Sequence, residues 1–256
     1  MIHALAIVDP SAQIAKDVVV GPWTIIGPDV VIGEGTVINS HVVIKGPTTI
    51  GKNNKIFQFC TVGEDCQDKK FKGEATRLEI GDGNIFREAC TIHRGTTQDN
   101  SITKIGNDNL FMVNVHIAHD VIVGDNCILA NDTNVAGHVH IGDTAILGGA
   151  SQVHQFVQIG SHSMCGTGSI VLKDVPAYIM ANGNSAKPHG INSEGLKRRG
   201  FTANDISALR KAYKIVYRQG LTLKEAMLDL DALLEQSSSV ALFIESLNTS
   251  TRGIIR

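Results

Sequence analysis

Three side chains that can carry protons or bind metal lie close together in the sequence, at His116, His119 and Asp120. A neutral imidazole can act as a general base near neutral pH, and a neighbouring carboxylate can orient it. The same residue types are metal ligands, because histidines and a water molecule make up many catalytic zinc sites. Solvated polar residues in a turn are a third explanation. The choice among the three depends on the elements that hold these residues.

A six-residue period organises most of the chain. An aliphatic residue occurs at every sixth position from Val8 to Val62, and the frame resumes at Ile80 and again at Ile105. Two residues before most of these positions stands a small or β-branched side chain, so both point to the same face of a short strand. Glycine and polar residues between them, as in "IGEGTV" and "VGDNCI", supply turns. We therefore expect coils of three short strands, stacked through parallel hydrogen bonds.

This repeat resembles that of the hexapeptide-repeat family, whose fold is a left-handed parallel β-helix. The resemblance, and not the spacing, gives the handedness, which is opposite to the usual crossover preference. The fold class that we predict is therefore mainly β, with the left-handed β-helix domain at residues 1–187. Residues 64–79 and 98–104 break the rhythm and should protrude as loops, where binding residues are common.

The last part of the chain has helical periodicity instead of the six-residue period. Two capping sequences, Thr202 with Asp205 and Thr222 with Glu225, each open an amphipathic segment. A shorter helical segment precedes them and another follows. We therefore predict a small C-terminal α-helical domain over residues 188–256.

Composition and charge argue against several classes of protein. The formal net charge of -2 argues against a general nucleic-acid binder. No apolar stretch is long enough to cross a membrane and the N-terminus lacks a secretory pattern, so we expect a cytoplasmic protein without membrane insertion. The cysteines form no CxxC pair, which argues against a zinc knuckle, and Cys60, Cys90 and Cys127 fall on the small position of the repeat.

The stacking of coils should bring distant histidines together. Residues about 18 apart lie one above another once the loop at 98–104 is set aside. His119, Gly137 and Gln155 then share one column, and His116 lies at an outward strand position beside it. The histidines that converge on this edge of the prism, from successive coils, are His93, His119, His138 and His154.

Three interpretations of this edge stay open: a general base, a metal site, or polar turn residues that are simply solvated. As a general base, His119 would need a donor for an oxyanion, and the N–H of Gly137 on the next coil is placed to be one. Asp120 is a possible orienter of His119, although adjacent side chains on an extended chain diverge. As a metal site, the edge offers several imidazoles, but His116 and His119 straddle a strand and a turn and need not point together.

Six segments in a fixed order carry a more specific resemblance. They are "TIHRGT", "NVHIAHD", "LANDTNVAGHV", "VHQF", "KDVPAY" and "NSEGLKRRGF". With the helical tail they resemble the acyl-(acyl-carrier-protein):UDP-N-acetylglucosamine O-acyltransferase family, which opens lipid A biosynthesis, over essentially the whole chain. The resemblance implies transfer of an (R)-3-hydroxyacyl chain from the thioester of acyl carrier protein to the 3-hydroxyl of UDP-N-acetylglucosamine, in a homotrimer with sites between subunits. It implies no metal and no other cofactor.

The resemblance also implies roles for single residues. His119 would be the general base, Asp120 its possible orienter, and the Gly137 N–H the oxyanion donor. The residues that would bind the sugar nucleotide or shape its pocket are Gln67, Asp68, Lys70, His93, His116, His138, His154, Gln155, Asn192, Glu194, Arg198 and Arg199. Thr167 matches the residue that limits acyl length, where members that accept longer chains have Gly. Because Thr fills space that Gly leaves open, we predict a shorter chain of about ten to twelve carbons.

The charge of the C-terminal part agrees with such substrates. Residues 194–218 contain more Lys and Arg than Asp and Glu, which suits a diphosphate and an acidic carrier protein. The plain alternative is the solvated face of an amphipathic helix. The competing functions are another hexapeptide acyltransferase that forms an amide or uses acetyl-CoA, a metal-dependent lyase, and a scaffold without catalysis.

Overall fold

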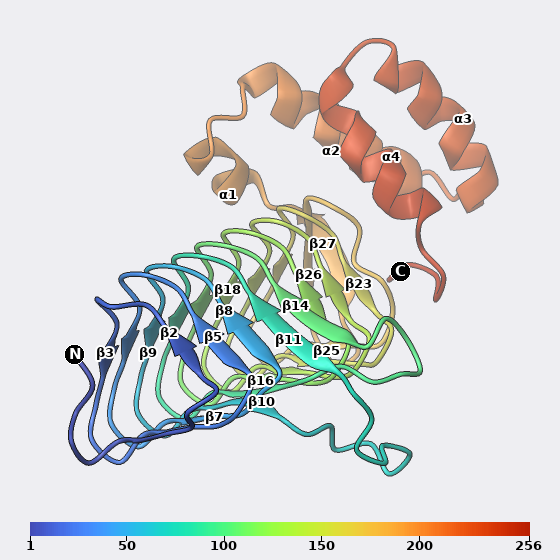
Figure 1. Cartoon of the computed structure of the whole chain (residues 1–256). Coiled ribbons are helices and arrows are strands. Elements are labelled where there is room, and N and C mark those ends of the chain that lie inside the picture. Colours follow the sequence, from blue (N-terminus) through green and yellow to red (C-terminus); the bar gives the residue numbers. More distant parts are fainter.

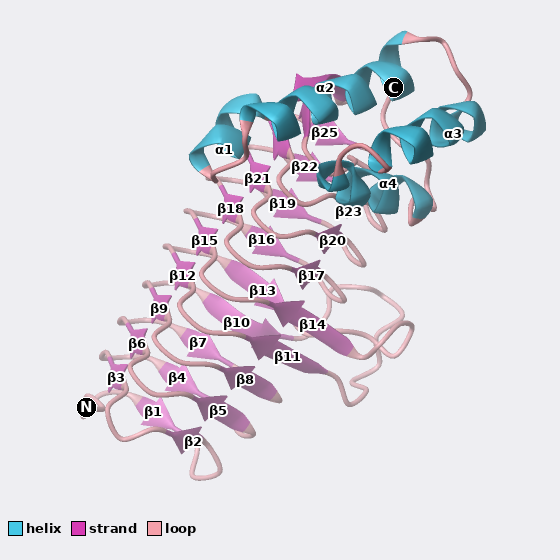
Figure 2. Cartoon of the chain, turned by 90° about the horizontal axis from the view of Figure 1, so that it is seen from above, coloured by secondary structure: helices cyan, strands magenta, loops and turns pink.

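The computed structural model describes residues 1–256 of the chain. Short strands wind into a left-handed parallel β-helix of triangular section, as the repeat and the family resemblance together predict, and four α-helices cover its C-terminal end (Figure 1). Viewed from above, the strands stand in three rows, one for each face of the prism (Figure 2). We number these faces sheets 1, 2 and 3 in the order in which each coil visits them.

Successive coils contribute their strands to the three sheets in turn, and β27 adds an antiparallel strand at the end of sheet 3. Sheet 1 consists of β1 (Ile7–Val8), β4 (Ile25–Ile26), β7 (Val43–Ile44), β10 (Thr61–Glu64), β13 (Thr91–His93), β16 (His116–Ile117), β19 (Asn134–Val135), β22 (Gln152–Val153) and β25 (Ile170–Val171). Sheet 2 consists of β2 (Gln13–Ile14), β5 (Val30–Ile32), β8 (Thr48–Ile50), β11 (Arg77–Ile80), β14 (Ile102–Ile105), β17 (Ile122–Val123), β20 (His140–Ile141) and β23 (Gln158–Ile159). Sheet 3 consists of β3 (Val19–Val20), β6 (Val37–Ile38), β9 (Lys55–Ile56), β12 (Ile85–Phe86), β15 (Leu110–Phe111), β18 (Ile128–Leu129), β21 (Ile146–Leu147), β24 (Met164–Cys165), β26 (Ile179–Asn182) and β27 (Lys187–Ile191).

The core is a column of side chains along the axis of the prism. The second residue of most two-residue strands is buried while the first is not, so a strand such as β16 presents His116 outward and Ile117 inward. Cys60, Cys90 and Cys127 are fully buried in this core. Each apolar row is covered only by the coils above and below, so the stack is stable only as a whole.

The strands reach further into both interruptions of the repeat than predicted. β10 continues through Glu64 and β11 already begins at Arg77, because Leu78 pairs with Thr48 of β8 and is completely buried. β14 begins at Ile102, so the second interruption is also shorter than its predicted extent of 98–104. The first loop, in teal, projects from the side of the prism (Figure 1).

The helical part begins at Asn192, which caps the first helix and donates a hydrogen bond to the His162 carbonyl of the β-helix. The helices are α1 (Ser193–Arg198), α2 (Ala203–Arg218), α3 (Leu223–Leu234) and α4 (Ala241–Asn248), with a 3₁₀ turn at Ser238–Val240 before α4. Both predicted capping boxes are present, at Thr202 with Asp205 and at Thr222 with Glu225. β27 crosses the predicted domain boundary between residues 187 and 188, because its antiparallel pairing with β26 continues to Ile191. No helix combines the length and the apolar character needed to cross a bilayer.

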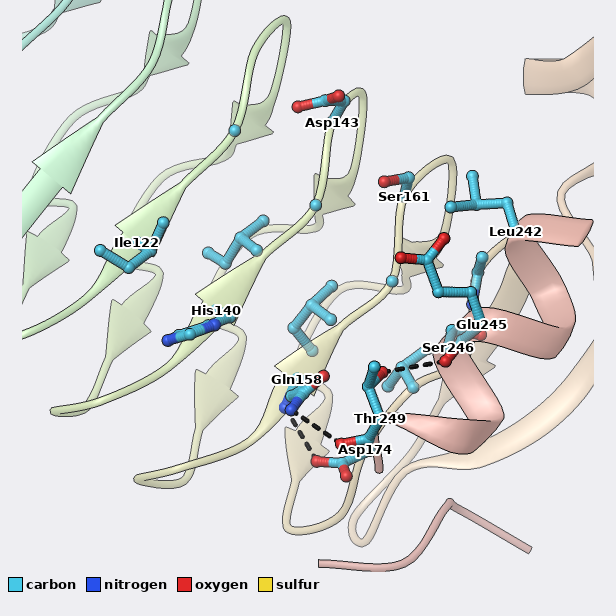
Figure 3. A pocket seen from close by; sticks show the side chains of 17 residues that line it. Ile122, His140, Asp143, Gln158, Ser161, Asp174, Leu242, Glu245, Ser246 and Thr249 are labelled. Carbon is cyan, nitrogen blue, oxygen red and sulfur yellow. Dashed lines mark hydrogen bonds between the residues drawn. The ribbon is translucent and has the colours of Figure 1, made fainter. Parts of the chain in front are cut away.

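Helix α4 lies against the last strands of sheet 2 and lines one side of an open cavity of about 320 Å³ (Figure 3). The two parts are joined there by hydrogen bonds from Gln158 Nε2 to the Thr249 carbonyl (3.1 Å) and from Ala177 N to Ser246 Oγ (3.0 Å). None of the site residues predicted from the sequence lines this cavity. The contacts around this cavity attach the helices to the β-helix.

Candidate active site

The His119–Asp120 pair forms at the corner where the chain turns from sheet 1 into sheet 2. Asp120 has a left-handed backbone, with φ of 60°, and this folds its carboxylate back toward the preceding side chain. His119 Nδ1 and Asp120 Oδ2 are 2.8 Å apart. Adjacent side chains diverge on an extended chain but not across this turn, so Asp120 is in contact with the imidazole.

Asp120 is buried and held by two threonines that the sequence analysis did not single out. The main-chain N–H and the hydroxyl of Thr96 donate to Asp120 Oδ1 (2.8 Å) and Oδ2 (2.6 Å), and the Asp120 N–H donates to Thr103 Oγ1 (2.8 Å). Burial alone would raise the pKa of the Asp120 carboxyl, but hydrogen bonds from His119 and Thr96 outweigh it, and the pKa lies below its ordinary value. Thr96 ends the segment "TIHRGT", but the six-residue period gave no signal for its contact with Asp120.

Gly137 stacks on His119 from the next coil, as the spacing predicts. A Cβ atom built at Gly137 would lie 2.5 Å from Cε1 and 2.7 Å from Nε2 of His119, so only glycine fits here. The neighbouring amides are used, from Ala136 to the Val153 carbonyl (3.1 Å) and from His138 to the His119 carbonyl (3.1 Å). The Gly137 N–H donates to no protein acceptor. It is a free donor on the residue that packs against the imidazole.

His138 lies one step further along the same corner. Its ring stacks on Phe156 with centroids 4.4 Å apart and meets His119 edge to face at 5.0 Å. His138 Nδ1 is 3.1 Å from Asp99 Oδ2 in the second loop, and its Nε2 is 3.8 Å from Asp120 Oδ2. The second loop therefore contacts the site directly, through Asp99.

His93 and His116 form a second pair of rings on the same side. Their centroids are 5.0 Å apart at an interplanar angle of 86°, and His116 Nδ1 is 2.7 Å from Thr91 Oγ1. Burial, aided by the nearby His116, lowers the pKa of His93 to about 4. Burial also lowers the pKa of His116. Both imidazoles are therefore neutral near neutral pH.

A cavity of about 410 Å³ opens over these rings. The predicted residues that line it are Gln67, Asp68, His93, His116, His119, Gly137 and Gln155. The side chains of Asn134 and Gln152 also line it, although the sequence analysis did not name them. Their signal was present, because both occupy the outward strand position that His116 occupies one and two coils earlier.

Other predicted residues do not reach this cavity within one chain. Lys70 and His154 are exposed beside it. Asn192 donates to the His162 carbonyl (3.1 Å) and Arg199 to the Thr144 carbonyl (3.1 Å), at the corner between sheets 2 and 3. Glu194 and Arg198 are exposed on the same short helix, α1. Thr167 is exposed at the third corner, between sheets 3 and 1. The predicted residues thus occupy all three corners of the prism.

The corner between sheets 1 and 2 also carries the only group of three side chains whose possible metal-ligand atoms lie close together. Ligand atoms of His119, Asp120 and His138 all lie within 4.8 Å of one another. Each is also engaged without a metal: His119 with Asp120, Asp120 with Thr96, and His138 with Asp99. The donor set alone is compatible with either a hydrogen-bonded relay or a metal site.

Two family models match the chain. The model described as UDP N-acetylglucosamine O-acyltransferase, domain 2, matches residues 174–255. The model described as bacterial transferase hexapeptide (six repeats) matches residues 11–46 and 102–137. The matches cover the helical end and two stretches of the β-helix.

Full-length relatives and solved structures give the same result. Acyl-(acyl-carrier-protein):UDP-N-acetylglucosamine O-acyltransferase of Azotobacter vinelandii is 60% identical over 256 residues, covering 100% of this chain and 99% of the relative. The solved LpxA of Acinetobacter baumannii is 57% identical with a TM-score of 0.98, covering 100% of this chain and 99% of that one. UDP-N-acetylglucosamine O-acyltransferase of Moraxella catarrhalis is 53% identical, also with a TM-score of 0.98, over 100% and 99% of the chains. The chain therefore belongs to the acyl-(acyl-carrier-protein):UDP-N-acetylglucosamine O-acyltransferase family.

Proposed function

We propose that the protein transfers an (R)-3-hydroxyacyl chain from the thioester of acyl carrier protein to the 3-hydroxyl of UDP-N-acetylglucosamine, the first step of lipid A biosynthesis. Relatives up to 65% identical carry the name of this activity. One observation carries the mechanism: an imidazole bonded to a buried carboxylate lines a polar cavity together with a residue whose main-chain N–H is free. This is the arrangement that acyl transfer to an alcohol requires.

His119 serves as the general base. Asp120 occupies Nδ1, so Nε2 carries the lone pair that removes the proton from the sugar 3-hydroxyl. The alkoxide oxygen forms the new bond to the thioester carbon, and the carbonyl oxygen becomes an oxyanion that accepts from the Gly137 N–H. The intermediate then collapses to the ester by breaking the carbon–sulfur bond, and the imidazolium of His119 returns the proton to the thiolate of the carrier.

The polar lining of the cavity binds the sugar nucleotide in this proposal. Gln67, Asp68 and Lys70 approach from the first loop. His93, His116, His138, His154 and Gln155 surround the sugar from the stacked coils. Asn192, Glu194, Arg198 and Arg199 supply the basic end that suits a diphosphate.

These groups come together in a homotrimer whose sites lie between subunits. If the corner between sheets 3 and 1 faces a threefold axis, the His119 corner of one subunit meets the Arg199 corner of the next. The outward positions of sheet 3 support this packing, because they are apolar and half-buried at Ile85, Leu110, Ile128, Ile146 and Met164. The outward row of sheet 2 is more polar, with Glu79, Lys104, His140 and Gln158 beside Val31 and Ile122.

Thr167 would then lie near the threefold axis, where an acyl chain running between subunits ends. Its side chain fills space at that end, so chains of about ten to twelve carbons are the preferred donors. A Thr167→Gly variant extends the preference to longer chains. A wild-type profile that peaks at fourteen carbons contradicts this proposal.

Product analysis tests the proposed reaction. The protein is incubated with UDP-N-acetylglucosamine and 3-hydroxyacyl thioesters of acyl carrier protein of several lengths. We expect a monoacylated sugar nucleotide whose acyl group is released by mild base, as an ester is. A base-resistant amide identifies an N-acyltransferase, and no product with any thioester points to a scaffold.

A further inference from the structure

The carboxylate of Asp120 is held at both of its oxygens by a single residue. Thr96 donates its main-chain N–H to Oδ1 (2.8 Å) and its hydroxyl to Oδ2 (2.6 Å), the same oxygen that faces His119 Nδ1 at 2.8 Å. Thr96 and Asp120 are each 2% exposed. Hydrogen bonds to a buried carboxylate are stronger than those between neutral groups, so this contact fixes the plane of the carboxylate.

Thr96 can reach Asp120 because the chain leaves its six-residue rhythm at this point. In regular coils the corner amide donates to a carbonyl of the coil before, as His138 N does to the His119 carbonyl and Phe156 N to the Gly137 carbonyl. At Asp120 that acceptor is the hydroxyl of Thr103. Thr96, which precedes the second loop, and Thr103, in β14 directly after it, thus hold the side chain and the main chain of Asp120.

No other side chain replaces this contact. His138 Nε2 is 3.8 Å from Asp120 Oδ2, which is too long for a hydrogen bond. The terminal torsion of an aspartate is broad, so without Thr96 the carboxylate would rotate away from the orientation that His119 needs.

We propose that Thr96 is a positioning residue for the acyl transfer: its hydroxyl and amide hold the Asp120 carboxylate so that His119 keeps its proton on Nδ1 and presents Nε2 to the substrate beside Gly137. The proposal rests on the proposed function, in which His119 is the base. It assigns a catalytic purpose to the second loop, which would otherwise be a tolerated insertion.

Thr96→Val tests this directly, because it removes the hydroxyl and keeps the shape and the main-chain N–H. We expect kcat to fall about tenfold to hundredfold, the equivalent of one hydrogen bond to a charged group, with KM for both substrates nearly unchanged. Thr96→Ser keeps the hydroxyl and restores kcat to within about threefold. Thr96→Ala is a second deletion that leaves room for the carboxylate, and it shows the same loss as Thr96→Val.

Thr36→Val is the matched control. Thr36 is as buried as Thr96, and in a distant coil its hydroxyl donates to the Gly51 carbonyl (3.0 Å) and accepts from the Asn54 N–H (3.2 Å), with no carboxylate partner. This variant keeps the wild-type kcat. An equal loss in Thr36→Val, a wild-type kcat in Thr96→Val, or a loss that Thr96→Ser does not restore would overturn the role of Thr96.

The tautomer of His119 separates this proposal from the proposed function. Nitrogen-15 chemical shifts of the substrate-free protein should show His119 protonated at Nδ1 in the wild type and in Thr96→Ser, and a mixture of tautomers in Thr96→Val. Unchanged shifts in Thr96→Val overturn the positioning role whatever reaction the protein performs. A wild-type protein without transferase activity overturns the proposed function and leaves this measurement valid.

Discussion

At the scale of residues, the chemistry depends on a contact between neighbours in the sequence. His119 and Asp120 meet only because Asp120 takes a left-handed turn conformation, with φ of 60°. The residue types and the stack of His119 under Gly137 could be predicted from the six-residue period. The contacts from Thr96 and Thr103 could not, because the insertion between them removes the register that places the other columns.

The Asp120→Asn substitution tests the pairing of the two side chains. An amide cannot stabilise the imidazolium, and its NH₂ group can donate to Nδ1 and reverse the tautomer. We expect kcat to fall about a hundredfold or more, with KM for UDP-N-acetylglucosamine nearly unchanged because Asp120 does not line the cavity. Steady-state kinetics provide the measurement. A kcat within about twofold of the wild type would show that Asp120 does not assist His119.

The depressed pKa of His93 predicts how stability depends on pH. The folded state keeps this imidazole neutral down to a pKa of about 4, whereas the unfolded chain takes up a proton below its ordinary pKa of 6.5. The unfolded state therefore binds more protons in this window, and the free energy of unfolding falls as the pH drops through it.

His93→Gln removes this contribution. Between pH 7 and pH 4.5, the wild type should lose about 2 to 3 kcal/mol more than the variant. Denaturant unfolding of both proteins at matched concentration measures the difference. Equal losses in the two proteins contradict a neutral buried His93.

At the scale of elements, the stacked coils set the distance between base and oxyanion donor. Gly137→Ala places a methyl group against the His119 ring, because a Cβ atom at this position would lie 2.5 Å from Cε1. We expect a fall in kcat of about a hundredfold, since the ring must move from its bond with Asp120. Gly27→Ala at the same edge of an earlier coil is the control, because its Cβ would have its nearest contact at 3.4 Å. An active Gly137→Ala enzyme would show that the imidazole does not need this position.

The sequence predicts the elements well where each carries its own local signal. Both capping boxes open helices as expected, because the cap and its partner are three residues apart on the same turn. The ends of the two loops were predicted less well. Leu78 and Thr103 stand two residues before Ile80 and Ile105, which is the pattern of a strand, but the interrupted frame hides it.

At the scale of the whole molecule, one chain holds the predicted site residues on three separate corners. The sequence predicts which residues lie on each corner. These corners can come together only through a neighbouring subunit, which only the resemblance implies. We expect a species of about three times the 27.4 kDa of the chain.

Two substitutions on different faces test this assembly. Ile128→Asp puts a charge on the apolar outward row of sheet 3, so it should yield monomers and abolish activity. Val31→Asp, at an exposed outward position of sheet 2 away from the helices, should leave both unchanged. Light scattering with an activity assay measures the outcome. A trimeric, active Ile128→Asp protein would exclude sheet 3 from the interface.

The most direct test of the central claim is the rate of sugar-ester formation by His119→Ala beside the wild type, each after exhaustive dialysis against a chelator. A general base predicts that the chelated wild type keeps its full rate and that the variant loses about a hundredfold to ten-thousandfold. A variant that keeps the wild-type rate, or a wild type that loses its rate on chelation and regains it with zinc, would contradict the account.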